Sequence, residues 1–163
     1  MRRPHLVILA AWFLNVAAWF LPAVTGVGGG RIDPPITGLG AFVMAASAVA
    51  GSQFLGTRYE ALLAILSVLT ELCFVIGSPL ALSRGTRPIQ RWSAWAACAA
   101  FFFNAHWFVR LKPDRWVSSL GIGYFLWWSS FAVLAIGLFD LAGRNNGAEL
   151  AQKEIAVRPE RLR

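Results

Sequence analysis

The chain has 163 residues, of which 57% are hydrophobic and only 14% are charged, and its formal net charge is +7. So few charged residues cannot cover the surface of a water-soluble globule, and the apolar residues form long blocks with the charges between them, which indicates an integral membrane protein. The basic residues are spread over short connectors and a tail, so they form no continuous face for nucleic acid, and the lipid bilayer is the expected partner.

The first apolar block, residues 6–24, follows a basic start and so looks like a secretory signal peptide. It differs because its apolar run exceeds the usual 7 to 15 residues, contains Asn15, and lacks a clean cleavage site of small residues. We therefore predict a retained membrane span. The Gly- and Pro-rich residues 25–37 predict a loop after it.

Residues 38–56, "GLGAFVMAASAVAGSQFLG", are long enough to cross a membrane but contain only two Leu. Four spans without this segment, with both termini inside, place ten Lys and Arg residues inside and five outside. The five are Arg31, Arg58, Arg110, Lys112 and Arg115. Five spans give a poorer bias, nine against six, with Arg2 and Arg3 outside. The positive-inside rule therefore favours four spans, with residues 38–56 as a re-entrant or hairpin segment on the outer side.

Three later blocks, residues 61–82, 92–111 and 117–141, each have the roughly 20 residues that a bilayer core of about 30 Å requires. The predicted fold is an all-α integral membrane four-helix bundle, with five spans as the alternative. Residues 1–142 form its transmembrane helical domain, and residues 143–163 form a polar, basic tail with a short amphipathic helix at "AELAQKEIAV". The expected location is a bacterial inner (cytoplasmic) membrane with both termini cytoplasmic.

One acidic residue, Glu71, lies near the middle of the second block. Asn15 has the same depth in the first block, and Ser129 and Ser130 have it in the last, which predicts an intramembrane polar layer. In the second block, Ser67, Glu71 and Ser78 share one helical face, with Thr70 beside them. That face is expected to point into the bundle.

An ionised acid at a helix centre costs about 2.5 to 3.5 kcal/mol on an insertion scale. One interpretation is that Glu71 is protonated and links helices by a hydrogen bond to Asn15 or a backbone carbonyl. The other is a charge partner or a wet cavity, with His106 as the nearest cationic candidate. A ligand or proton site would then contain Glu71, Asn15, Asn104 and His106, the last two lying in the outer half of the third span.

The sequence gives little support for a metal site, a disulfide or a catalytic site. Asn104 and His106 are two residues apart and face different ways, so they are not a metal pair. Cys73 and Cys98 have no CxxC spacing and are interpreted as small core residues. No motif for catalysis, phosphate or metal is present, so no catalytic residue, metal or cofactor is predicted. Trp127 and Trp128 lie in mid-span, where they serve helix packing or line a ligand pocket.

Two functions therefore remain open. The first is a non-catalytic accessory or stabilising subunit of a larger membrane complex, whose partners are other membrane subunits or further copies of the chain. The second is a lipid-modifying enzyme or a small transporter that uses an intramembrane site around Glu71. The absence of a catalytic set favours the first.

Overall fold

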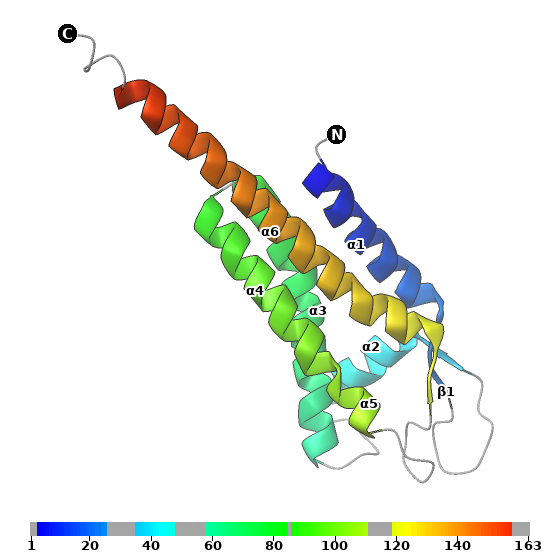
Figure 1. Cartoon of the computed structure of the whole chain (residues 1–163). Coiled ribbons are helices and arrows are strands. Elements are labelled where there is room, and N and C mark those ends of the chain that lie inside the picture. The colour runs from blue at the N-terminus through cyan, green and yellow to red at the C-terminus, as the bar shows by residue number, and fades with distance from the viewer. Residues whose placement is uncertain (1–2, 26–34, 48–57, 85, 111–118, 158–163) are drawn as a thin grey trace.

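The computed structural model describes residues 3–25, 35–47, 58–84, 86–110 and 119–157. Long helices run side by side, and short helices and strands gather at one end (Figure 1). In chain order the elements are α1 (Arg3–Phe20), β1 (Pro22–Thr25), β2 (Ile36–Thr37), α2 (Gly38–Ser47), α3 (Arg58–Arg84), α4 (Arg87–Asn104), α5 (His106–Arg110), β3 (Ser119–Leu120) and α6 (Ile122–Val157).

Three of these helices, α1, α3 and α6, are long and apolar enough to cross a membrane. Their apolar stretches are Arg3–Phe20, Ala61–Ser83 and Ile122–Arg144. At 1.5 Å per residue, each extends far enough to cross most or all of a hydrocarbon core of about 30 Å. The predictions of a mostly helical chain and of long apolar helices that could span a membrane are therefore confirmed.

Helix α3 runs antiparallel to α1. Asn15 of α1 bonds to Glu71, while Trp12, one turn earlier, bonds to Ser78, which lies later in α3. A crossing by residues 38–56 would have made the two helices parallel. Within that segment α2 has ten residues and is about 15 Å long, half of a bilayer core. Residues 48–56 lie outside the described part of the chain.

The predicted boundaries of the first and last spans are wrong at the end where the strands lie. Helix α1 stops at Phe20, because Pro22 disfavours the helical conformation at the residue before it. Residues 22–25 instead form β1, which pairs antiparallel with both β2 and β3. Helix α6 begins only at Ile122, after β3, so this small sheet ties α1, α2 and α6 together. A sheet was not predicted from the sequence.

One further boundary differs from the prediction. The third block was expected to be one helix over residues 92–111, but α4 begins at Arg87 and ends at Asn104, and α5 follows after Ala105. Helix α6 continues without a break from the last apolar block into the predicted tail and ends at Val157. In Figure 1 this helix extends beyond the others, at the end where the N-terminus also lies.

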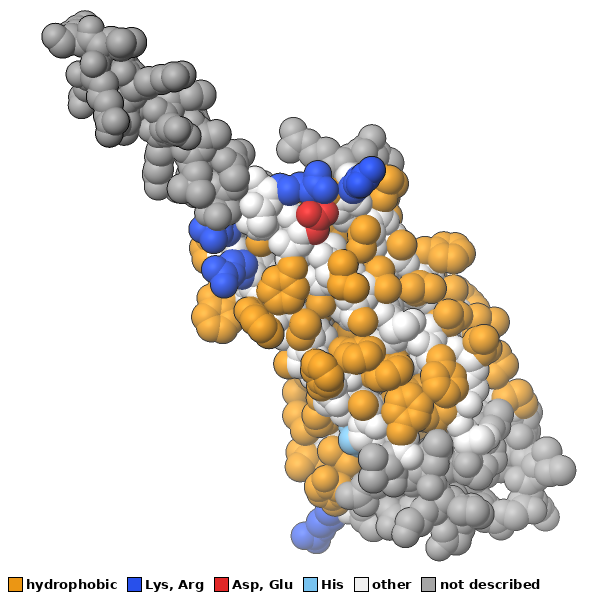
Figure 2. Space-filling view, viewed as in Figure 1, with side chains coloured by type: hydrophobic (Ala, Val, Ile, Leu, Met, Phe, Trp, Pro, Cys, Tyr) orange, Lys and Arg blue, Asp and Glu red, His pale blue; other side chains and the backbone are white. Residues whose placement is uncertain are grey.

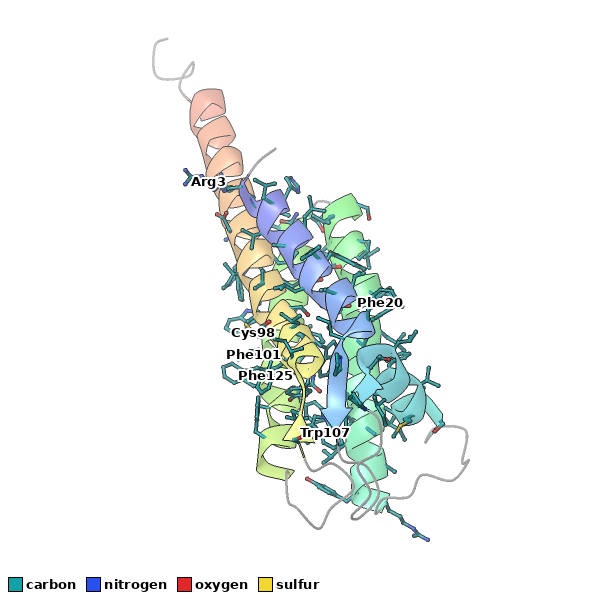
Figure 3. All side chains as sticks on the ribbon, turned by 90° about the vertical axis from the view of Figure 1, so that its right-hand side faces the viewer. Arg3, Phe20, Cys98, Phe101, Trp107 and Phe125 are labelled. Atoms are coloured by element: carbon teal, nitrogen blue, oxygen red, sulfur yellow. The ribbon has the colours of Figure 1, made fainter. Side chains whose placement is uncertain are left out.

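Among the described residues, the two ends of the molecule differ in charge. At one end, here called the arginine end, lie Arg3, Arg87, Arg91 and Arg144. The other, the strand end, holds the sheet, α2, α5 and Arg58. Figure 3 shows Arg3 and Trp107 at these opposite ends, and Figure 2 shows a belt of hydrophobic side chains between the charged regions.

Helix α6 lies between α1 and α4 and packs closely against both. Small residues permit this close approach: Ala11 and Ala18 on α1, and Ala94, Ala97 and Ala100 on α4, are all buried. At Gly137 a Cβ atom would lie 2.7 Å from Cγ1 of Ile8 and 3.3 Å from its backbone nitrogen. Close contact through small residues is a common way for helices to associate in lipid, where water supplies no hydrophobic driving force.

Helix α3 is joined to the other helices mainly by large and polar side chains. Phe74 packs edge to face against Trp12 at 5.3 Å and against Phe131 at 5.4 Å, and Phe131 in turn meets Trp127 at 5.3 Å. These rings fill the space between α3, α1 and α6. The polar groups of the candidate site lie on the same side of α3.

Candidate functional site

The Glu71 carboxyl group lies where α1, α3 and α6 meet. Its Oε2 atom accepts a hydrogen bond from Nε1 of Trp127 at 2.7 Å and another from Nδ2 of Asn15 at 3.2 Å. The Trp19 side chain also lies close to this carboxyl group. Glu71 is only 2% exposed and Asn15 only 1%. One carboxyl oxygen therefore links α3 to two other helices.

Two oxygens of this cluster have no hydrogen-bond partner among the described residues: Oε1 of Glu71 and Oδ1 of Asn15. Because Oε2 already accepts two N–H groups, Oε1 is the atom on which a protonated Glu71 would carry its hydrogen. A protonated acid would thus change one of the two acceptors into a donor. The arrangement can hold a proton at this position, and a neutral acid is the less costly form at such depth.

The two serines expected in the same layer behave differently. Ser130 is fully buried, and its hydroxyl lies 3.4 Å from Nδ2 of Asn15 while donating to the Trp127 carbonyl. Ser129 is half-buried, and its hydroxyl donates to the carbonyl of Leu126 in its own helix. The structure thus places Ser130 beside Asn15 and Glu71, whereas the bond of Ser129 stays within α6.

A second polar cluster lies on the neighbouring turn of α3 and links that helix to α4. Oδ1 of Asn104 accepts from the Ser67 hydroxyl at 2.8 Å, and its Nδ2 donates to Oγ1 of Thr70 at 3.0 Å and to the Ala100 carbonyl at 2.8 Å. Nε1 of Trp107 donates to Ser67 at 3.2 Å. Asn104 is completely buried, and every polar atom of its side chain has a partner.

The end of α4 explains why Asn104 and His106 lie where they do. The last carbonyl groups of a helix lack partners in the next turn. Three of them receive side-chain donors: Phe101 from Nε1 of Trp128 at 2.8 Å, Phe103 from Nδ1 of His106 at 2.7 Å, and Asn104 from the Tyr124 hydroxyl. Since a carbonyl only accepts, Nδ1 of His106 carries the hydrogen.

The structure therefore divides the predicted ligand or proton site. Asn15 and Glu71 share one cluster, Asn104 belongs to the second, and the Nδ1 atom of His106 binds the end of its own helix. Ser67 and Ser78, which share the predicted inward face of α3 with Glu71, bond to α4 and α1 respectively.

The hydrogen bonds donated by the indole groups were not predicted from the sequence. Nε1 atoms of Trp12, Trp107, Trp127 and Trp128 each reach an acceptor on another helix. One signal was available, because a buried indole N–H has to find an acceptor and mid-span positions exclude water. Which acceptor each would meet depends on how the helices are rotated, and spacing alone does not give that.

No group of three or more His, Cys, Asp or Glu residues able to hold a metal ion is found in the described part of the chain. Cys73 is an exposed free thiol and Cys98 a half-buried one. The expected core position of Cys73 is therefore wrong, since its side chain lies on the outer face of α3.

Comparison with protein-family models, with curated proteins and with solved structures found no match to this chain.

Proposed function

We propose that this protein is a non-catalytic integral membrane subunit that stabilises a larger membrane complex. The observation that carries this proposal is the use of Glu71: one of its oxygens accepts bonds from α1 and α6, and the side chain is 2% exposed. An intramembrane acid used in this way links helices, a role for which such bonds supply about 0.6 to 2 kcal/mol each.

The proposed topology adds α4, continued by α5, as a fourth span. Its direction supports this, because it runs antiparallel to α3: Asn104 meets Ser67, while Gln90 meets the carbonyl of Ala81. Both chain termini then lie at the arginine end, which the positive-inside rule assigns to the cytoplasm. Together α1, α3, α4 and α6 make the four-helix bundle of the proposal, in an inner membrane of bacterial type.

The outer face of α1 offers a surface for a partner helix. Large apolar side chains on it follow alternate steps of three and four residues and are all exposed: Leu6, Leu9, Phe13, Val16 and Phe20. This spacing keeps one stripe of a helix facing a neighbouring helix, as in coiled-coil packing. We call these five residues the α1 seam. The proposed occupant is a membrane helix of another subunit.

The α1 seam is tested by replacing Phe13, which is 73% exposed, with Ala. Phe102 of α4 is also 73% exposed and lies outside the seam, so Phe102→Ala is the matched control. We expect tagged protein, purified from its own membranes in mild detergent, to lose its partner in Phe13→Ala and to keep it in Phe102→Ala. Equal loss in both variants, or wild-type protein that carries only lipid, would contradict the proposal. If the complex contains only this chain, the helix that occupies the α1 seam belongs to a further copy of it and not to another subunit.

The second candidate is a lipid-modifying enzyme or small transporter at Glu71. Oε1 of Glu71 and Oδ1 of Asn15, which have no hydrogen-bond partner among the described residues, favour it, because Oε1 could take a proton and both oxygens could accept a hydrogen bond from a ligand. Glu71→Gln separates the two functions. It keeps a hydrogen-bonding side chain of the same shape, so an accessory subunit retains its partner, whereas transport or catalysis that needs an exchangeable proton is lost.

A further inference from the structure

We propose that the arginine end carries a binding site for an anionic phospholipid, in a groove between α4 and α6. The groove is a hollow of about 220 Å³, lined by Arg87 and Arg91 of α4 and by Phe139, Ala142 and Gly143 of α6. We call it the arginine groove. The proposal rests on membrane insertion and is independent of any partner subunit.

The two arginines lie one helical turn apart on the same face of α4. The structure pairs neither of them with an acidic side chain within its described residues. The acid that lies nearby in sequence on the lining helix, Asp140, is instead engaged by Arg144, whose Nε and Nη2 atoms donate to it at 3.0 and 3.2 Å. The groove therefore keeps two positive charges available for a phosphate group.

The same face of α4 becomes aromatic toward the membrane interior. Trp95 follows Arg91 by one turn and packs edge to face on Phe139, a residue of the groove, with ring centroids 5.2 Å apart. Trp92 is 75% exposed beside it. Tryptophan is typical of the level where headgroups meet acyl chains.

Charge and apolar surface are thus arranged in the order of a phospholipid. The arginines face the phosphate, and Trp95 and Phe139 face the first part of the acyl chains. Basic pockets between membrane helices are a recognised form of anionic headgroup site. Figure 2 shows Lys and Arg side chains gathered at this end, above the hydrophobic belt.

The first test compares phosphatidylglycerol with phosphatidylcholine of the same acyl chains, each titrated onto delipidated full-length protein in detergent and followed by native mass spectrometry. We expect phosphatidylglycerol to bind at least about tenfold more tightly, and inorganic phosphate at equal concentration not to displace it. Equal binding of the two lipids overturns the proposal. Displacement by phosphate also overturns it, because the site would then recognise free phosphate instead of a lipid.

The second test removes the charges. Arg87→Gln combined with Arg91→Gln should weaken phosphatidylglycerol binding about 25-fold, since each basic residue near a membrane surface contributes about fivefold. Arg58→Gln, a matched change at the strand end, should leave binding within about twofold. An unchanged double variant, or an equal loss in Arg58→Gln, contradicts the site.

The third test fills the groove and keeps both arginines. Gly143 lines the hollow, and a Cβ atom there would meet nothing within 4 Å, so Gly143→Leu adds a side chain beside the hollow with no clash at its Cβ atom. Gly77 of α3 is equally open, which makes Gly77→Leu the matched control. We expect at least about fivefold weaker phosphatidylglycerol binding in Gly143→Leu alone. This variant decides the matter even if the double arginine variant does not fold, and equal affinities in the two leucine variants overturn the proposal.

Discussion

The two polar clusters on α3 lie one turn apart and differ in how completely their atoms are bonded. In the Asn104 cluster every polar atom of the Asn104 side chain has a partner on α3 or α4. In the Glu71 cluster Oε2 of Glu71 accepts two bonds, while Oε1 and Oδ1 of Asn15 have none among the described residues. Asn104, Asn15 and Glu71 are each 2% exposed or less, so burial does not explain the difference.

The chemistry of the side chains explains it. An amide offers both donors and acceptors, so Asn104 can satisfy hydroxyl and carbonyl groups around it. An ionised carboxylate only accepts, and the second acceptor beside it, Oδ1 of Asn15, has no donor among the described residues. The Asn104 cluster therefore links α3 to α4 with every polar atom of the Asn104 side chain hydrogen-bonded. In the Glu71 cluster one more hydrogen can be accommodated between Oε1 of Glu71 and Oδ1 of Asn15, so this cluster can respond to a proton.

The largest effect is expected from breaking the complete cluster. Asn104→Leu removes two bonds between helices, so the Ser67 hydroxyl loses the oxygen to which it donates and the Thr70 hydroxyl loses one donor. We expect a loss of about 2 to 3 kcal/mol in the free energy of unfolding, from bonds of about 0.6 to 1.7 kcal/mol each and the cost of unpaired buried groups. Unfolding in mixed micelles measures it. Phe102→Leu, on the exposed face of the same helix, serves as the control and should change stability little.

A smaller loss is expected when one donor to the Glu71 cluster is removed. Trp127→Phe keeps a ring against Phe131 but deletes the N–H that reaches Glu71, which should cost about 1 kcal/mol. Trp128→Phe deletes a bond to a backbone carbonyl of α4 and should cost about the same. The two variants differ in a second measurement, because only Trp127→Phe should alter the infrared carboxyl signal of Glu71. Identical spectra for both would show that the indole of Trp127 does not contact the acid.

The smallest effect is expected from Glu71→Gln. If the acid is neutral, its amide analogue keeps the acceptor for Trp127 and supplies a donor for Oδ1 of Asn15, so stability should stay within about 0.5 kcal/mol of the wild type. The infrared band of a protonated carboxyl group should be present in the wild-type protein and absent from this variant. A large loss of stability, with no such band in the wild type, would show that Glu71 is ionised.

Depth along the spans was predictable from the sequence, and rotation about them was not. Residue counting placed Asn15 and Glu71 at the same level, and the structure joins them by a hydrogen bond of 3.2 Å. The same counting placed both Ser129 and Ser130 in the polar layer, but only the Ser130 hydroxyl lies near Asn15. Neighbouring residues on a helix point about 100° apart, so an error of one position turns an inward side chain outward.

The ends of the helices were also less predictable than their apolar centres. Because of Pro22, α1 ends at Phe20 and not at residue 24, where the apolar block ends. Residues 22–25 form β1 instead. Helix α4 ends at Asn104, inside an apolar block. The side chains of Trp128, His106 and Tyr124 donate hydrogen bonds to its last carbonyl groups. A hydropathy profile cannot predict where this helix ends, because it contains no information about which side chains donate hydrogen bonds to the last carbonyl groups.

By itself the sequence determined that this chain is helical, that it has apolar helices long enough to span a membrane, and that an acid lies near the middle of one of them, since each follows from the length and composition of the apolar runs. Only the tertiary structure decided which donors surround that acid and how closely α1 approaches α6. These depend on helix rotation and on the volumes of facing side chains such as Gly137 and Ile8, which meet only when the chain is folded.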